Sequence, residues 1–130
     1  MSQENVEIVR AGDDAWNAGN SDALRELYDP DIVARPNDDW PERGPFFGRE
    51  AVVRWFEQVR STWDSTVVET VSRTDAGDRV VSRRIVHGAG HGPALRFEHT
   101  IVATVRKGKI VYIEFFRDHA DALEAVGLSE

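Results

Sequence analysis

The stretch from residue 94 to 106 alternates between apolar and polar side chains more regularly than the rest of the chain, and it constrains the fold most. Its odd-numbered positions are Leu95, Phe97, His99, Ile101, Ala103 and Val105. Most of the even-numbered positions are polar or charged. Because successive side chains of a β-strand point to opposite faces, this pattern predicts a strand with one buried and one solvated face. His99 is the single polar residue on the predicted buried face.

Helical periodicity marks the first part of the chain and strand periodicity the second. Apolar residues recur at helical spacing over about 3–18, 20–27 and 49–61, and a short strand is expected over 31–37. Strands are expected at 64–75, 79–88, 94–106 and 109–117, with turn residues between them and a short capped helix after residue 118. Segregated helices and strands predict an α+β fold, and the length of 130 residues fits a single domain over 1–130.

Composition narrows the possible partners and chemistry. The chain has no cysteine, which excludes disulfides, zinc–thiolate sites and a cysteine nucleophile. Its net charge of −7 argues against a nucleic-acid partner, because phosphate binding needs clustered Lys and Arg. The N-terminal residues carry no long apolar run, so we expect a cytoplasmic protein with no membrane partner. His87 and His91 flank a glycine-rich stretch that is interpreted as a loop, so no metal site is predicted.

The order of elements, together with four local signatures, resembles the SnoaL-like branch of the NTF2-like superfamily. The signatures are AWNAGN at 15–20, LRELYDPDIV at 24–33, GREAVVRWF at 48–56 and GKIVYIEFFRDHADALEAVGL at 108–128. The resemblance implies a cone, in which a curved antiparallel or mixed sheet wraps around about three N-terminal helices, with a short C-terminal helix. It also implies a homodimer that binds a small apolar or polycyclic molecule in the cavity without a cofactor.

Three residues are candidates for catalysis. His99 titrates near neutral pH and is a candidate acid or base. If the apolar faces of the last two strands match, Arg117 lies near His99, where it could stabilise negative charge. Asp38, in the loop after the first strand, is a second candidate base. The alternatives are a buried, satisfied His99 paired with a neighbour such as Arg117 or Tyr28, a surface ion pair of Arg117, and a solvated turn acid at residue 38.

Aromatic and aliphatic residues on the predicted inward faces would line the cavity. The ligand-contact candidates are Arg83, Trp40, Tyr28, Trp16, Phe97, Ile101, Ile113 and Phe115. The strand at 79–88 does not alternate cleanly, so the face of Arg83 is left open. Trp16 and Tyr28 are equally compatible with plain core packing.

The catalytic groups of the families that this chain resembles are missing from their expected positions. In ketosteroid isomerases two carboxyl groups and a tyrosine do the chemistry, and Pro36, Ile101 and about Gly12 occupy those positions here. In limonene-epoxide hydrolases two aspartates are used, and Phe115 and Ile85 stand in their place. Two functions therefore stay open. One is a cofactor-independent enzyme that catalyses isomerisation, cyclisation, dehydration or hydrolysis by proton transfer. The other is a non-catalytic binding or dimerisation module.

Overall fold

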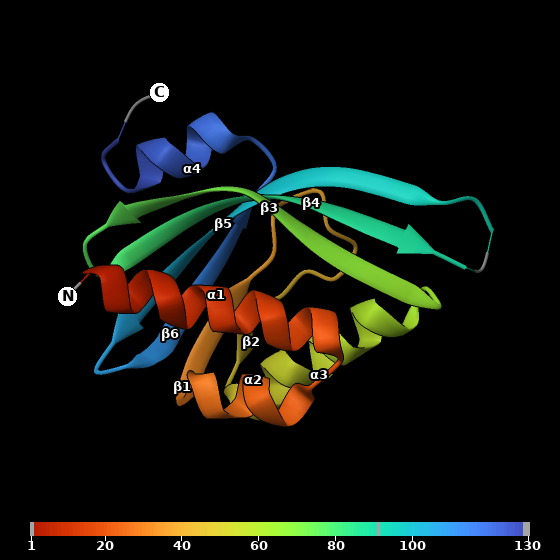
Figure 1. The fold of residues 1–130 in the computed structure, drawn as a ribbon, viewed down its shortest axis with the longest axis horizontal. Helices are drawn as coiled ribbons and strands as arrows, with labels where there is room; N and C mark the ends of the chain where they lie inside the picture. Colours follow the sequence, from red (N-terminus) through yellow and green to blue (C-terminus); the bar gives the residue numbers. More distant parts are fainter. Residues whose placement is uncertain (1, 91, 129–130) are drawn as a thin grey trace.

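The structure, a computed structural model, describes residues 2–90 and 92–128 (Figure 1). The helices are α1 (Ser2–Ala18), α2 (Ser21–Leu27), α3 (Arg49–Ser61) and α4 (His119–Ala125). The strands are β1 (Tyr28–Arg35), β2 (Phe46–Phe47), β3 (Ser65–Ala76), β4 (Arg79–Ala89), β5 (Leu95–Arg106) and β6 (Lys109–Phe116). They form one sheet in the order β2-β1-β6-β5-β4-β3, in which only the β1–β6 pair is parallel. The predicted α+β cone with a short C-terminal helix is confirmed.

The helices cover the two faces of the sheet unequally. Figure 1 shows α1, α2 and α3 on one side of the curved sheet and α4 on the other. α1 packs against β3 and β4, whereas α3 packs against β1 and β2. α4 closes a smaller apolar cluster on the opposite face with Val81, Val102, Ala122 and Leu123. The large core, and the space for a ligand, therefore lie between the sheet and the three N-terminal helices.

The α1–α2 corner forms as its residues predict. Gly19 adopts a φ of +68° just past the end of α1, a left-handed conformation that glycine reaches without steric cost. The side chain of Asn20 then accepts a hydrogen bond from the Ala23 N–H at 3.1 Å and caps α2. This corner packs α2 against α1, α3 and β1. By contrast, Asp118 precedes α4 without a side-chain capping bond, so the expected capping-box start is not formed.

β1 begins at Tyr28, immediately after α2 and three residues earlier than expected. The sequence suggested a later start because Pro30 was expected to stop the preceding helix. The structure accommodates Pro30 in a register shift between Tyr28 and Val33, opposite β6. The two-residue strand β2, which pairs Val33 with Phe47, was not predicted, because so short a segment shows no alternation. Within the described residues, no helix is long and apolar enough to cross a membrane.

The register across β4, β5 and β6 places the inward-facing residues side by side. His99 lies opposite Arg84 of β4, and Ile101 lies opposite Phe115 of β6. Ile113 follows on the same face of β6, opposite Ala103. The odd-numbered face of β5 is therefore turned toward the helices, as the alternation predicts.

Candidate functional site

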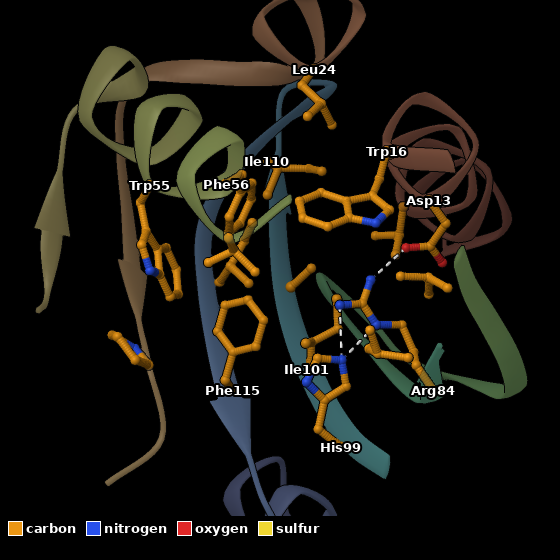
Figure 2. A pocket seen from close by; sticks show the side chains of 18 of the residues that line it. Asp13, Trp16, Leu24, Trp55, Phe56, Arg84, His99, Ile101, Ile110 and Phe115 are labelled. Atoms are coloured by element: carbon orange, nitrogen blue, oxygen red, sulfur yellow. Dashed lines mark hydrogen bonds and ion pairs between the residues drawn. The ribbon is translucent and has the colours of Figure 1, made fainter. Parts of the chain in front are cut away.

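A cavity of about 100 Å³ lies between the sheet and the helices (Figure 2). Its wall combines side chains from α1, α2 and α3 with the inward faces of β1, β3, β4, β5 and β6 and with the loop after β1. The lining is apolar for the most part. Asp13, Arg84 and His99 gather where α1 meets β4 and β5, whereas Asn37 lies in the loop after β1. The cavity therefore has a long apolar wall and one polar end.

Packed aromatic rings form the apolar wall. Trp55 of α3 stands at its centre, with its ring 4.5 Å from that of Phe46 and stacked on it. Phe56 and Phe115 meet Trp55 at 5.1 and 5.4 Å between centroids. Trp40, from the loop after β1, closes one side through contacts with Trp55 and Phe97 at 6.5 and 6.3 Å. Tilted and edge-on pairs are arrangements that aromatic rings prefer, so these contacts fix the ring positions.

The polar end is a chain of three buried side chains, Asp13, Arg84 and His99. Arg84 donates from Nη1 to the Asp13 carboxylate at 2.7 Å. It also donates from Nε to Nε2 of His99 at 3.1 Å. The other carboxylate oxygen of Asp13 accepts from Arg73 Nη2 at 2.7 Å and from Thr70 Oγ1 at 3.0 Å. One carboxylate thus orients two guanidinium groups, and one of these holds the histidine.

His99 is held neutral with a defined tautomer. Because Nε2 accepts a hydrogen bond from Arg84, the proton of a neutral imidazole must sit on Nδ1. Burial, reinforced by the positive charge of Arg84, holds the pKa of His99 well below its ordinary value of 6.5. Figure 2 shows the other ring nitrogen on the side of His99 that faces Phe115. His99 therefore offers a hydrogen-bond donor, and its lone pair is already used.

Tyr28 lies elsewhere on the cavity wall, opposite Ile110 at the start of β6. It is 3 % exposed and lines the cavity from the start of β1. Burial raises the pKa of its hydroxyl well above 10, with a smaller upward effect of Asp13 and a downward effect of Arg84. The hydroxyl stays protonated at any physiological pH, so it is available as a donor.

Most of the predicted ligand-contact residues lie in the cavity wall. Those on the wall, together with His99, are Trp40, Tyr28, Trp16, Phe97, Ile101, Ile113 and Phe115. Three predicted site residues, Asp38, Arg83 and Arg117, are not on it. The structure thus brings together the apolar candidates and His99 but separates them from the predicted acid and both predicted arginines.

The expected closeness of Arg117 to His99 is wrong. The strand register would place residue 117 opposite residue 99, but β6 ends at Phe116 and the chain turns out of the sheet. The side chain of Arg117 is 74 % exposed and pairs with Asp39 at 2.8 Å. Arg83 is exposed and faces Glu98 at 3.8 Å on the outer side of the sheet. Asp38 is exposed in the loop, which agrees with the solvated turn acid that was its alternative.

The sequence reasoning missed Asp13 and Arg84, although both left a signal. Asp13 lies four residues after Val9 and three before Trp16, so it shares the buried stripe of its helix. An acid on an apolar stripe needs a buried partner. For Arg84 the signal lies in the strand register. If the hairpin closes symmetrically around residues 88–93, Arg84 lies on the same face of the sheet as Phe97 and His99.

A metal site is not indicated. The described residues contain no group of three or more His, Asp or Glu side chains that could hold an ion. His87 pairs with Glu69 at 3.1 Å on the outer face, and His91 lies outside the described residues.

The fold, with its cavity between the sheet and the helices, defines an α+β cone protein of the NTF2-like type. A model of the SnoaL-like domain matches residues 9–113, so the chain belongs to the SnoaL-like domain family. The comparison with curated proteins gives no significant match.

Three solved structures illustrate the shared fold. Bal32a, from a soil-derived mobile gene cassette, has a TM-score of 0.82 at 23% identity, over 91% of this chain and 92% of that one. A putative SnoaL-like polyketide cyclase from Jannaschia sp. CCS1 has a TM-score of 0.80 at 19% identity, over 100% and 96% of the chains. TerC has a TM-score of 0.78 at 16% identity, over 95% and 98%.

Proposed function

We propose that this protein binds a small, mainly apolar molecule in the cone cavity. The observation that carries the proposal is a cavity with aromatic walls and one hydrogen-bonded polar end. Ligand sites have this composition, because apolar walls supply affinity and a few placed polar groups supply orientation. TerC, which has the same fold, was co-crystallised with polyporic acid, in keeping with the use of this fold for small molecules.

The volume favours a ligand with one ring over a polycyclic one. The cavity of about 100 Å³ is smaller than ligand pockets of roughly 300–1,000 Å³ and than a cavity of about 150 Å³ that accepts benzene. A single ring would need small shifts of the wall, and a fused ring system would need Trp40 to leave its place. Trp40 is the wall residue best placed to move, because an irregular loop carries it.

The polar end favours binding over proton-transfer catalysis. A catalytic base needs a lone pair that can reach the substrate. Asp13 is the only carboxylate among the described lining residues, and its oxygens accept from Arg84, Arg73 and Thr70. The Nε2 lone pair of His99 is bonded to Arg84. The polar end is therefore built to donate hydrogen bonds, and a non-catalytic binding role is the function that this geometry supports best.

The test is binding of 4-fluorotoluene, a single apolar ring, followed by its ¹⁹F NMR signal. We expect saturable binding to the wild type. Ala103→Leu, which fills the cavity from β5, is expected to weaken binding by roughly tenfold or more. Ala122→Leu is the matched control, because Ala122 is also buried but belongs to α4, on the opposite face of the sheet. Circular dichroism checks that both variants are folded.

No saturable binding to the wild type would refute the proposal. Equal weakening in Ala103→Leu and Ala122→Leu would show that the effect comes from overpacking of the core and not from filling of the cavity. That result would also contradict the proposal.

A further inference from the structure

The loop between β1 and β2 carries one large side chain into the cavity wall. The loop covers residues 36–45, which belong to no helix or strand. Within 38–44 every residue is exposed except Trp40, which is half-buried and lines the cavity. Its ring lies 6.5 Å from that of Trp55 on α3 and 6.3 Å from that of Phe97 on β5. One indole ring therefore spans the gap between the helix layer and the sheet.

The cavity is closed more firmly elsewhere. At its opposite end Tyr28 lies beside Ile110 at the start of β6, and both are 3 % exposed. Between α1 and α3 the wall is closed by Trp16, whose ring packs edge-on against Phe56 at 5.8 Å. The guanidinium group of Arg60 lies over the Trp16 ring at 5.6 Å and donates to the Trp16 carbonyl oxygen. These side chains have little freedom, because helices or paired strands hold them on both sides.

The loop is a compact unit with a closed base. The Trp40 N–H donates to the Asn37 carbonyl oxygen at 3.1 Å, and the Asp39 N–H donates to the Asn37 side chain at 2.9 Å. The two ends of the loop meet where a Cβ placed on Gly44 would stand only 2.6 Å from Cδ of Pro36. Surface loops whose ends lie in contact are compact, so we expect this one to move as a unit about its base.

Few interactions hold this unit against the rest of the protein. Arg117 Nη1 donates to the Asp39 carboxylate at 2.8 Å, and the two side chains are 74 % and 63 % exposed. Among the residues that the structure describes, this is the only hydrogen bond between residues 37–44 and another element. Exposed ion pairs contribute little to stability. The Trp40 indole N–H is buried without a partner in the described residues, which offsets part of the gain from burying its ring.

We propose that residues 37–44 form a lid over the cavity and that Trp40, the side chain with which the lid closes it, determines the size of the ligand. The proposal rests on the small-molecule binding proposed above and adds the route of entry and the specificity-determining residue. The lid turns about its base at Pro36 and Gly44, the Trp40 ring leaves the gap between α3 and β5, and the ligand enters there. Once the lid has closed again, the cavity of about 100 Å³ favours one ring over two.

The experiment compares 4-fluorotoluene, which has one ring, with 1-fluoronaphthalene, which has two fused rings, by ¹⁹F NMR. Titration gives the affinities, and line-shape analysis gives the association and dissociation rate constants. In Trp40→Ala we expect the association rate constant of 4-fluorotoluene to rise by roughly tenfold or more, because association that requires a conformational change is slow. The affinity for 1-fluoronaphthalene relative to 4-fluorotoluene should also rise by roughly tenfold or more, because the missing indole leaves space for a second ring.

Trp63→Ala is the matched control. Trp63 is also half-buried in a loop, but it packs on Gly88 and does not line the cavity, so its loss should change neither the rate nor the preference. Circular dichroism checks that both variants are folded. Equal effects of the two substitutions, or unchanged association in Trp40→Ala, would overturn the lid. Faster association in Trp16→Ala alone would place the entrance between α1 and α3 and would overturn it as well.

Arg117→Ala tests the lid without removing a packed side chain. The ion pair with Asp39 holds the closed lid equally with and without ligand, so its loss should speed association and dissociation by the same factor, up to about fivefold. The affinity for 4-fluorotoluene should not change. Arg83→Ala, which removes an exposed partner of Glu98 on the outer face of the sheet, is the control and should change neither rate. Rates in Arg117→Ala that match those in Arg83→Ala would contradict the role of the ion pair in holding the lid.

The lid and the proposed function fail in different ways. If 4-fluorotoluene binds to the wild type and associates equally fast with Trp40→Ala, the cavity is a ligand site and the lid is wrong. If 4-fluorotoluene binds to neither protein, both proposals are refuted.

Discussion

Replacing Asp13 with asparagine removes the one negative charge that faces Arg73 and Arg84. The carboxylate oxygens lie 2.7 Å from both guanidinium groups, and the Asp13 side chain is only 7 % exposed. Asparagine keeps the size and one carbonyl oxygen, so one arginine retains an acceptor. The amide nitrogen turns a donor toward the other arginine, whose charge is then buried without compensation.

The expected cost is about 3 kcal/mol of unfolding free energy. Breaking a buried ion pair by removing one partner typically costs about 3–5 kcal/mol, and the retained carbonyl places this change at the lower end. Urea denaturation followed by tryptophan fluorescence measures it, with the midpoint falling and the slope unchanged. Asp14→Asn, one residue along the same helix but exposed, is the control and should change stability by less than about 0.5 kcal/mol. A loss below about 1 kcal/mol in Asp13→Asn would refute the reasoning.

Two further predictions concern His99 and Arg117. Because the pKa of His99 is lowered on folding, the unfolded chain takes up a proton below pH 6.5 that the folded chain does not. Stability should therefore fall by about 1.4 kcal/mol for each pH unit between 6.5 and the folded pKa, with no effect above that window. Urea midpoints at a series of pH values should show a shallower acid loss in His99→Gln, and parallel curves would contradict the assignment. Arg117→Ala should cost less than about 1 kcal/mol, because its pair with Asp39 is exposed, and should leave the affinity for 4-fluorotoluene unchanged. Weakened binding in Arg117→Ala would contradict the placement of Arg117 outside the ligand site.

The sequence was sufficient for the fold and for the apolar half of the candidate site. The stripe of α3 and the alternation of β5 identify which residues face inward, because burial of a helix or strand requires one apolar face. His99 stands out for the same reason, as a polar residue on such a face. These inferences depend only on residues close together in the sequence, and the periodicity of a helix or strand determines which of those residues share a face.

The polar half of the site could not be predicted from the sequence in the same way. Arg83 and Arg84 are adjacent, so one of them must face inward, and the mixed composition of β4 does not show which. Asp13 was not identified as a site residue, since its partners lie far along the chain. The prediction that Arg117 lies near His99 was wrong for a different reason. A strand register predicts where side chains lie only as far as the strand continues, and β6 ends one residue too early.

The hydrogen bonds of Asp13 also bear on when the cavity can form. They join residues separated by 57, 60 and 71 positions along the chain, and so connect the first helix to strands formed much later. Contacts of such long range form late in folding, because the entropy cost of closing a large loop must be met before the contacts stabilise the chain. Hydrogen exchange at the polar end of the cavity should consequently require opening of the whole domain, and a chain that is still being synthesised cannot bind ligand until β4 has docked on the N-terminal helix.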